Sequence, residues 1–185
     1  MTHKEKPPIV AAQRLSPVGR ASLQRHEGIK DYYNDLAGNC TKGIGVLVHY
    51  GHCTAGELKQ KISDEEKIKS FSLSVDVAER AVRQQTKNQP LTQEQFYALV
   101  SFTYNVGAYG AKQILANVNS GKIRTAASEM QRYNKYTPLD ERGKPLRAKD
   151  GAIIKKVSRG LTNRRMEEAR ALLKGSEKLN AAIVE

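Results

Sequence analysis

The sequence predicts an α+β protein in which one short antiparallel β region precedes a larger group of helices. Between residues 29 and 53, apolar and polar residues alternate and glycines interrupt them, which is typical of short paired strands. Three capping boxes then open helices, at Thr54, Ser63 and Thr92, each with Glu or Gln three residues later. The helix after Thr92 is apolar on almost every side and therefore belongs in the centre of a domain.

The first helix is predicted from Ser16 to Glu27. Ser16 is a typical N-cap, Pro17 suits the first helical turn, and Gly28 ends the helix. Glu27 therefore lies at the negative end of the helix dipole, which disfavours a second negative charge. This position favours the protonated carboxylic acid, the form that a general acid requires.

The later helices are predicted from their caps and from the spacing of their apolar residues. Residues 64–85 form a helix, but Ser70, Ser72 and Ser74 suggest a bend or loop before its second half. The apolar central helix ends at about Gly107. We expect shorter helices over 111–119 and 123–133, an exposed loop or small hairpin over 137–151, and a last helix over 161–174.

We predict one folded domain over residues 16–175. Its β-rich lobe covers about 29–53 and its helical lobe about 64–175. Residues 1–15 combine charges and prolines and are expected to form a flexible N-terminal arm, while residues 176–185 form a tail. The N-terminal residues contain no apolar segment of the kind found in signal peptides, so we expect no cleavable signal peptide.

The chain is strongly basic, with 31 Lys and Arg against 19 Asp and Glu and a net charge of +12. Of this charge, +9 lies within residues 121–174. Such a region attracts polyanions, namely nucleic acid, anionic lipid or a cell wall rich in phosphate and carboxylate, although it also serves as a solubilising surface. No apolar run approaches the length of about 18 residues that a membrane-spanning helix needs.

Two cysteines, Cys40 and Cys53, flank the glycine-rich turn, and His49 and His52 lie between them. We expect two free thiols, which are the usual state of a cytoplasmic chain. A disulfide that closes the hairpin is the second possibility. A metal site is the third, because His52 and Cys53 are adjacent and are poorly placed to bind one ion together.

The stretch from His26 to Thr41 contains the candidate chemistry. Glu27 at a helix end is followed eight residues later by Asp35 in an extended segment, and then by a glycine-rich turn. Two such carboxylates suit acid–base hydrolysis of a bond between sugars. The alternative is a helix end, a polar loop and a hairpin without chemistry.

The order of these residues resembles the active-site segment of the phage-type lysozymes, glycoside hydrolase family 24. The matching pattern is Glu27-Gly28, Tyr33-x-Asp35 and Gly38-x-x-Thr41-x-Gly43-x-Gly45. Stretches at 76–82, 95–107 and 160–168 resemble the same family in the same order. The resemblance implies a lysozyme-like fold, with a small β-hairpin lobe, a larger all-helical lobe and a cleft between them.

The same resemblance implies a muramidase that cuts the β-1,4 bond between N-acetylmuramic acid and N-acetylglucosamine in peptidoglycan. Glu27 matches the general acid, Asp35 the second carboxylate, and Thr41 the hydroxyl that helps to place the attacking water, with inversion at the sugar carbon. Tyr104 and Asn105 are candidate substrate contacts, or alternatively a core residue and a helix cap. We expect no cofactor and no metal.

The chain departs from the family in three places. Val46 follows the Gly-x-Gly motif where the family usually has His, and the histidines come later, at His49 and His52. The spacing from Glu27 to Asp35 is one residue shorter than usual. The segment between Asn134 and Gly160 is longer than usual.

We expect a monomer that is made in the cytoplasm and acts on peptidoglycan in the periplasm or cell wall, after holin release or injection. Its other partners would be delivery machinery and an immunity or inhibitor protein, with no nucleic acid and no membrane insertion. Two alternatives remain from the sequence. A lytic transglycosylase would use one acid and no water, and a basic nucleic-acid-binding domain would use the charged region, although no aromatic stacking stripe accompanies it.

Overall fold

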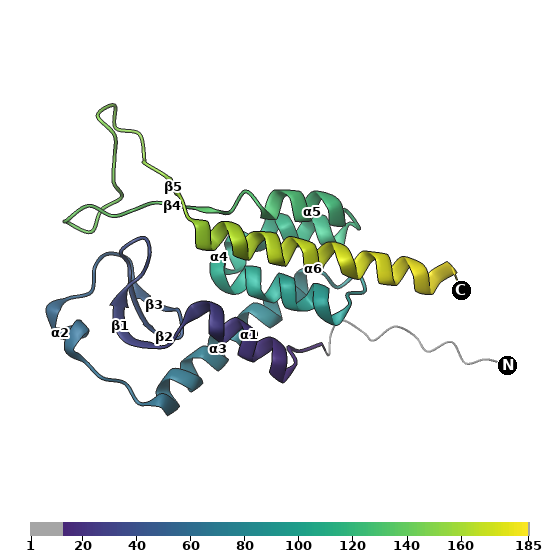
Figure 1. Ribbon diagram of the computed structural model, residues 1–185, viewed down its shortest axis with the longest axis horizontal. Coiled ribbons are helices and arrows are strands. Elements are labelled where there is room, and N and C mark those ends of the chain that lie inside the picture. Colours follow the sequence, from purple (N-terminus) through teal and green to yellow (C-terminus); the bar gives the residue numbers. More distant parts are fainter. Residues whose placement is uncertain (1–12, 185) are drawn as a thin grey trace. The chain divides into compact units, whose positions relative to one another are not determined.

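The computed structural model describes the backbone of residues 13–184 and the side chains of residues 13–174 (Figure 1). The predicted N-terminal arm therefore lies outside the described residues as far as residue 12. The chain divides into two compact units. The helical unit contains the chain up to Arg20, Val75–Tyr133 and the chain from Asn163. The sheet unit contains Ala21–Ser74 and Asn134–Thr162.

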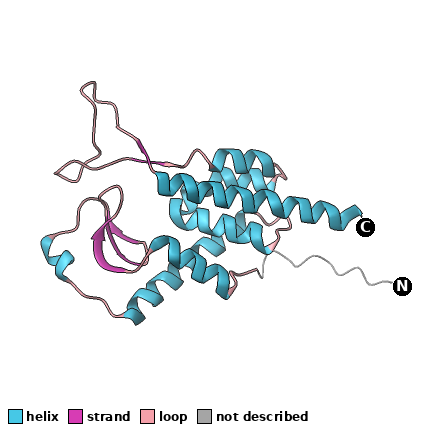
Figure 2. Ribbon diagram, viewed as in Figure 1, coloured by secondary structure: helices cyan, strands magenta, loops and turns pink. Residues whose placement is uncertain are grey.

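The sheet unit contains a three-stranded antiparallel sheet, drawn in magenta in Figure 2. Its strands are β1 (Lys30–Asn34), β2 (Cys40–Gly43) and β3 (Val46–His49), in the order β1-β2-β3. This confirms the predicted β region. The short helix α2 (Ala55–Lys59) follows, and it opens with the capping box predicted at Thr54.

Helix α1 (Pro17–Glu27) begins and ends where the sequence predicts. The Ser16 side-chain oxygen accepts a hydrogen bond from the Gly19 amide at 3.1 Å, as an N-cap does. Gly28 then adopts a φ of 70°, a left-handed conformation that glycine reaches without a steric penalty. The helix therefore stops directly after Glu27.

Helix α3 (Asp64–Gln85) is continuous, so the predicted bend or loop near Ser70 is wrong. The Ser70 hydroxyl donates back to the carbonyls of Glu66, at 2.8 Å, and Lys67, at 3.1 Å. A serine inside a helix can satisfy its hydroxyl in this way, and its polarity then gives no signal of a break.

The helical unit is built on α4 (Gln93–Asn119), α5 (Ile123–Met130) and α6 (Arg159–Val184). The predicted break in the central helix is present, because Gly107 has φ 76° and ψ 161° and kinks α4 there. The α4 residues that form the centre of the core are fully buried: Phe96, Leu99, Phe102, Ile114, Leu115 and Val118. Helix α6 continues to Val184, through the segment predicted as a tail. No helix among the described residues has both the length and the apolar character required to span a membrane.

A buried ionic cluster crosses the helical unit between α4 and α6. Glu168 is 3% exposed and its Oε1 accepts hydrogen bonds from the Ser101 hydroxyl at 2.6 Å, Arg164 Nε at 3.1 Å and an Arg165 amino group at 3.1 Å. Arg165 Nε also lies 2.8 Å from Glu168 Oε2, and the Arg165 guanidinium stacks 4.8 Å from the ring centre of Phe102. Two buried arginines thus donate hydrogen bonds to one carboxylate.

The segment that is longer than usual forms an extended arm in the sheet unit. It leaves β4 (Lys135–Tyr136) and returns through β5 (Lys156–Val157), which pair as a short antiparallel ribbon. Residues 137–155 between these strands are called the arm below. Isolated bridges join Leu139 to Pro145 and Arg147 to Ile153. The expected exposed loop or small hairpin is therefore hydrogen-bonded along its length.

Candidate active site

Glu27 is the last residue of α1 and its side chain is partly buried. Gly45, in the turn between β2 and β3, lies directly against its carboxylate. A Cβ built on Gly45 would lie 2.5 Å from Glu27 Oε2 and 3.1 Å from its carboxyl carbon. Gly45 also has a φ of 71°, which side chains of L residues rarely adopt. The Gly-x-Gly turn thus leaves the space that the Glu27 carboxylate occupies.

Asp35 follows β1 and holds the tight turn that leads into β2. Its Oδ1 accepts three backbone hydrogen bonds, from Ala37 at 2.9 Å and from Gly38 and Asn39 at 2.8 Å each. The other carboxylate oxygen, Oδ2, accepts no hydrogen bond from the described residues. One oxygen therefore fixes the side chain, and the other is available to a water or a substrate.

Thr41 lies in β2 and is 4% exposed. Its hydroxyl donates to the Asn39 carbonyl at 3.3 Å, while the Asn39 amide donates to Asp35. One backbone unit thus connects the two side chains. Glu27, Asp35 and Thr41 all belong to the sheet unit.

Tyr33 is a further member of this group that was not predicted as a site residue. It is paired with Thr41 across β1 and β2, and Lys30 Nζ lies 4.7 Å from its ring centre. Burial raises the pKa of the Tyr33 phenol, and the negative charges of Glu27 and Asp35 raise it further, while a hydrogen bond from the Gly45 backbone opposes the change. The Tyr-x-Asp motif contained this residue, but its spacing alone did not show whether Tyr33 is a site residue or a core residue.

The prediction of two free thiols is wrong, because Cys40 and Cys53 form a disulfide. The Cys40 amide donates to the Gly51 carbonyl at 2.8 Å. This bond holds the segment after β3 against Cys40 and so brings Cys53 close to it. The sequence could not show this pairing, since it depends on the register of β2 and β3. The bond closes the hairpin, which was the second possibility.

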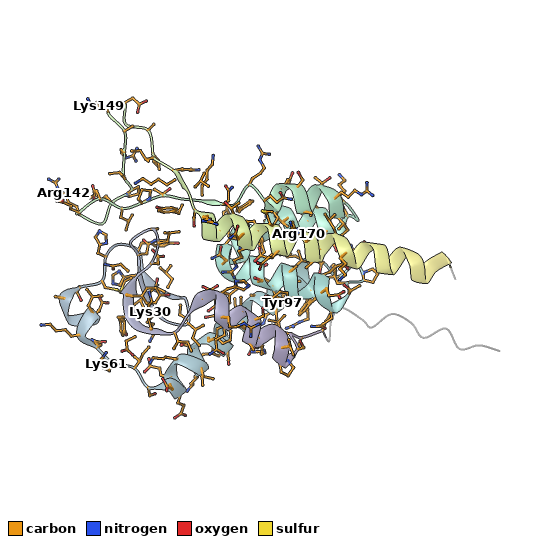
Figure 3. All side chains as sticks on the ribbon, viewed as in Figure 1. Lys30, Lys61, Tyr97, Arg142, Lys149 and Arg170 are labelled. Atoms are coloured by element: carbon orange, nitrogen blue, oxygen red, sulfur yellow. A yellow bond between two sulfur atoms is a disulfide. The ribbon has the colours of Figure 1, made fainter. Side chains whose placement is uncertain are left out.

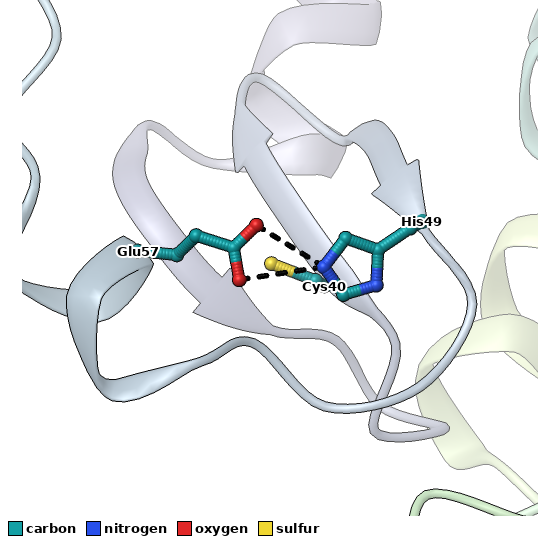
Figure 4. Close-up of side chains that lie close together, drawn as sticks. All are labelled: Cys40, His49 and Glu57. Carbon is teal, nitrogen blue, oxygen red and sulfur yellow. Dashed lines mark hydrogen bonds and ion pairs between the residues drawn. The ribbon is translucent and has the colours of Figure 1, made fainter.

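Cys40, His49 and Glu57 have potential metal-binding atoms within 4.8 Å of one another (Figure 4). A disulfide sulfur is not the thiolate that binds metal ions well. His49 instead lies between the Tyr50 carbonyl, 3.0 Å from Nδ1, and the Glu57 carboxylate, 3.1 Å from Nε2. The bond to Tyr50 and then that to Glu57 raise the pKa of His49 against its desolvation. His49 thus contacts the Glu57 carboxylate that completes the capping box of α2.

The candidate substrate residues Tyr104 and Asn105 belong to the helical unit and directly precede the kink of α4 at Gly107. Tyr104 is partly buried and Asn105 is exposed. Both therefore present surface, unlike Phe102 two residues earlier, which is fully buried. Tyr133, from the same unit, packs edge-on against Phe102 with ring centres 5.1 Å apart.

Replacing Gly45 with alanine is expected to reduce activity by roughly 10- to 100-fold, because the new Cβ displaces the Glu27 carboxylate. Gly151→Ala is the matched control, since Gly151 also has a positive φ, of 85°, but has open space around it. Turnover of soluble peptidoglycan fragments by both variants measures the difference. Equal losses in the two variants would show that backbone strain, and not the contact with Glu27, is responsible.

A small three-stranded sheet beside the acidic end of a helix, together with a mainly helical unit, defines a lysozyme-like α+β protein, as predicted. A solved structure supports this class: the endolysin from Escherichia coli O157:H7 phage FAHEc1 is 30% identical with a TM-score of 0.63, over 88% of this chain and 94% of that chain. The family model of phage lysozyme matches residues 24–168. The chain belongs to the phage lysozyme family, which confirms the resemblance found in the sequence.

Curated relatives of the chain carry the name endolysin. The protein from Bacillus phage PZA is 38% identical over 90 residues, which are 48% of this chain and 28% of that protein. The protein from Acyrthosiphon pisum secondary endosymbiont phage 1 is 28% identical over 125 residues, which are 65% of this chain and 80% of that protein. The chain thus spans less than a third of the first relative and most of the second.

Proposed function

We propose that this protein is a peptidoglycan muramidase that hydrolyses the β-1,4 bond between N-acetylmuramic acid and N-acetylglucosamine. The observation that carries the proposal is the fit of Glu27 against Gly45, in the unit that also holds Asp35 and Thr41. Membership of the phage lysozyme family supports it. The reaction needs no cofactor, because two carboxyl groups and a water supply all of its proton transfers.

In the proposed reaction, Glu27 gives its proton to the oxygen of the departing sugar. Asp35 Oδ2 accepts a proton from the attacking water, and the Thr41 hydroxyl helps to orient that water. The three amides on Asp35 Oδ1 keep the carboxylate from rotating during this step. Attack by a water on the face opposite the acid inverts the configuration at the sugar carbon.

Tyr104 and Asn105 are proposed to contact the sugar chain, since both present surface at the end of the first part of α4. We further propose that the protein acts as a monomer on peptidoglycan in the periplasm or cell wall, with release by a holin or injection as the route. An inhibitor protein and delivery machinery would be its protein partners.

The stereochemistry of the product tests the proposed reaction. A soluble peptidoglycan oligosaccharide is mixed with the protein, and proton NMR follows the new reducing end before it equilibrates. Inversion at a β-linked sugar yields the α-anomer first. Initial release of the β-anomer would contradict direct attack by the water held at Asp35.

The basic region over residues 121–174 is expected to draw the protein to anionic walls. Attraction between exposed charges is screened over about 8 Å at physiological salt. Binding to purified walls should therefore weaken as salt rises, while turnover of a small neutral chitooligosaccharide should change much less. Sedimentation with walls and product release measure the two quantities. If wall binding and chitooligosaccharide turnover fell equally as salt rises, the basic region would not be what draws the protein to walls.

A further inference from the structure

The arm folds into two turns that differ in what they contact. The first, residues 139–144, is called the docked turn, and the second, residues 148–152, the outer turn. Figure 3 labels Arg142 in the docked turn and Lys149 in the outer turn. The outer turn is closed by its own bonds, such as that from the Ala148 amide to the Ala152 carbonyl at 2.9 Å. The docked turn also contacts the ends of the three-stranded sheet.

A chain of hydrogen bonds leads from the docked turn to Asp35. The Leu139 amide donates to the Ala37 carbonyl at 2.8 Å. The Ala37 amide in turn donates to Asp35 Oδ1 at 2.9 Å. The arm therefore contacts the same peptide turn that fixes the second carboxylate.

His52 makes the second connection. Its Nε2 lies 2.8 Å from the Asp140 carbonyl, which only accepts, so Nε2 carries the hydrogen and donates it. The ring also packs on Gly38, where a built Cβ would lie 2.9 Å from His52 Cε1. Nδ1 is buried without a hydrogen-bond partner among the described residues. A buried polar atom without a partner is unfavourable, so a gain elsewhere must maintain this ring position.

The docked turn is stabilised by hydrogen bonds within itself. Asp140 Oδ1 accepts from the amides of Arg142 and Lys144 at 2.9 Å each. The hydrogen bond from the Lys144 amide is the largest of the interactions that lower the pKa of Asp140. Gly143 then approaches so closely that a built Cβ would lie 3.3 Å from Gly51 Cα. The contact is therefore made by a preformed turn against backbone, with little room for adjustment.

We propose that the arm positions Asp35 for the reaction, and that His52 is the positioning residue that joins the docked turn to the Asp35 turn. The inference rests on the proposed role of Asp35 as the second carboxylate. Without the arm, the peptides of Ala37 and Gly38 would lose their outer contacts, and Oδ2 would point in a wider range of directions. In this proposal His52 acts through the Asp35 turn and not on the substrate, so its loss should change turnover and leave substrate binding intact.

The test compares His52→Ala and His52→Gln with Asp150→Ala, which loosens only the outer turn by removing the acceptor of the Ala152 amide. NMR measures hydrogen exchange at the Gly38 and Asn39 amides, while kcat and KM are measured on soluble peptidoglycan fragments. In His52→Ala, we expect exchange at both amides to rise by about tenfold and kcat to fall by roughly 10- to 100-fold, with KM and Tm held. His52→Gln retains a donor for Asp140 and should recover part of kcat.

Several results would overturn the proposal. Parental exchange at Gly38 and Asn39 in His52→Ala would show that the arm does not hold the turn. A parental kcat despite faster exchange would show that the held turn is not needed for the reaction. If Asp150→Ala lowered kcat as much as His52→Ala, the docked turn would have no special role. If the parent protein released no sugar product, the proposed function would fail instead, and the exchange rates would still decide whether the arm holds the turn.

Discussion

Glu27→Gln should reduce peptidoglycan hydrolysis by at least about 10²-fold, since a positioned general acid contributes roughly 10²–10⁴-fold. The amide has nearly the same shape as the carboxylic acid, so the contact with Gly45 is retained. What is lost is the proton that must reach the departing sugar oxygen. Release of soluble fragments from purified walls measures the effect.

Glu65→Gln is the matched control for this experiment, because it makes the same chemical change at an exposed position in α3. Its activity should equal that of the parent. Circular dichroism and thermal unfolding should show both variants folded, and wall binding should persist in both, since the basic region is unchanged. A folded Glu27→Gln protein that cleaves walls at the parental rate would end the assignment of Glu27 as the acid.

Glu168→Ala is expected to cause a large loss of stability, about 3–5 kcal/mol, because it removes the buried carboxylate that pairs with both Arg164 and Arg165. Urea denaturation with an unchanged m-value would measure it. Glu167→Ala, at an exposed neighbouring position, should stay within roughly 0.5 kcal/mol of the parent.

The double variant Arg165→Met with Glu168→Leu separates two causes of this loss. If the lost pairing of Arg165 with Glu168 is the cause, apolar side chains that replace both members of this pair should restore part of the stability. If the double variant is less stable than Glu168→Ala, packing lost around Phe102 is the larger effect. An average substitution costs about 1 kcal/mol. If Glu168→Ala costs no more than this, the proposed contribution of the cluster to stability would be contradicted.

The sequence predicted those parts of the fold that depend on local chemistry. The end of α1 at Glu27 follows from Gly28, and the starts of α2 and α4 follow from capping boxes whose bonds involve residues three apart. The kink at Gly107 likewise follows from one residue. Glu27, Asp35 and Thr41 were predicted as site residues because their order along the chain is itself a motif, and their catalytic roles remain a proposal.

The parts that the sequence did not predict depend on contacts between distant residues. The Cys40–Cys53 bond depends on the register of β2 and β3. The contact of His52 with Asp140 joins residues 88 positions apart, and a histidine in a polar segment gives no sign of such a partner. The prediction of a bend at Ser70 was wrong for a different reason, because a serine hydroxyl can form a hydrogen bond inside a helix as well as at its end.

The most direct test of the account is the chemical end that the protein leaves on the glycan. Purified peptidoglycan is digested in water enriched in ¹⁸O, and the fragments are examined by mass spectrometry. Hydrolysis through Glu27, Asp35 and a water predicts reducing-end N-acetylmuramic acid that carries one ¹⁸O atom. Fragments that end mainly in 1,6-anhydro sugars without the label would mean that no water attacks, and would contradict the proposed mechanism.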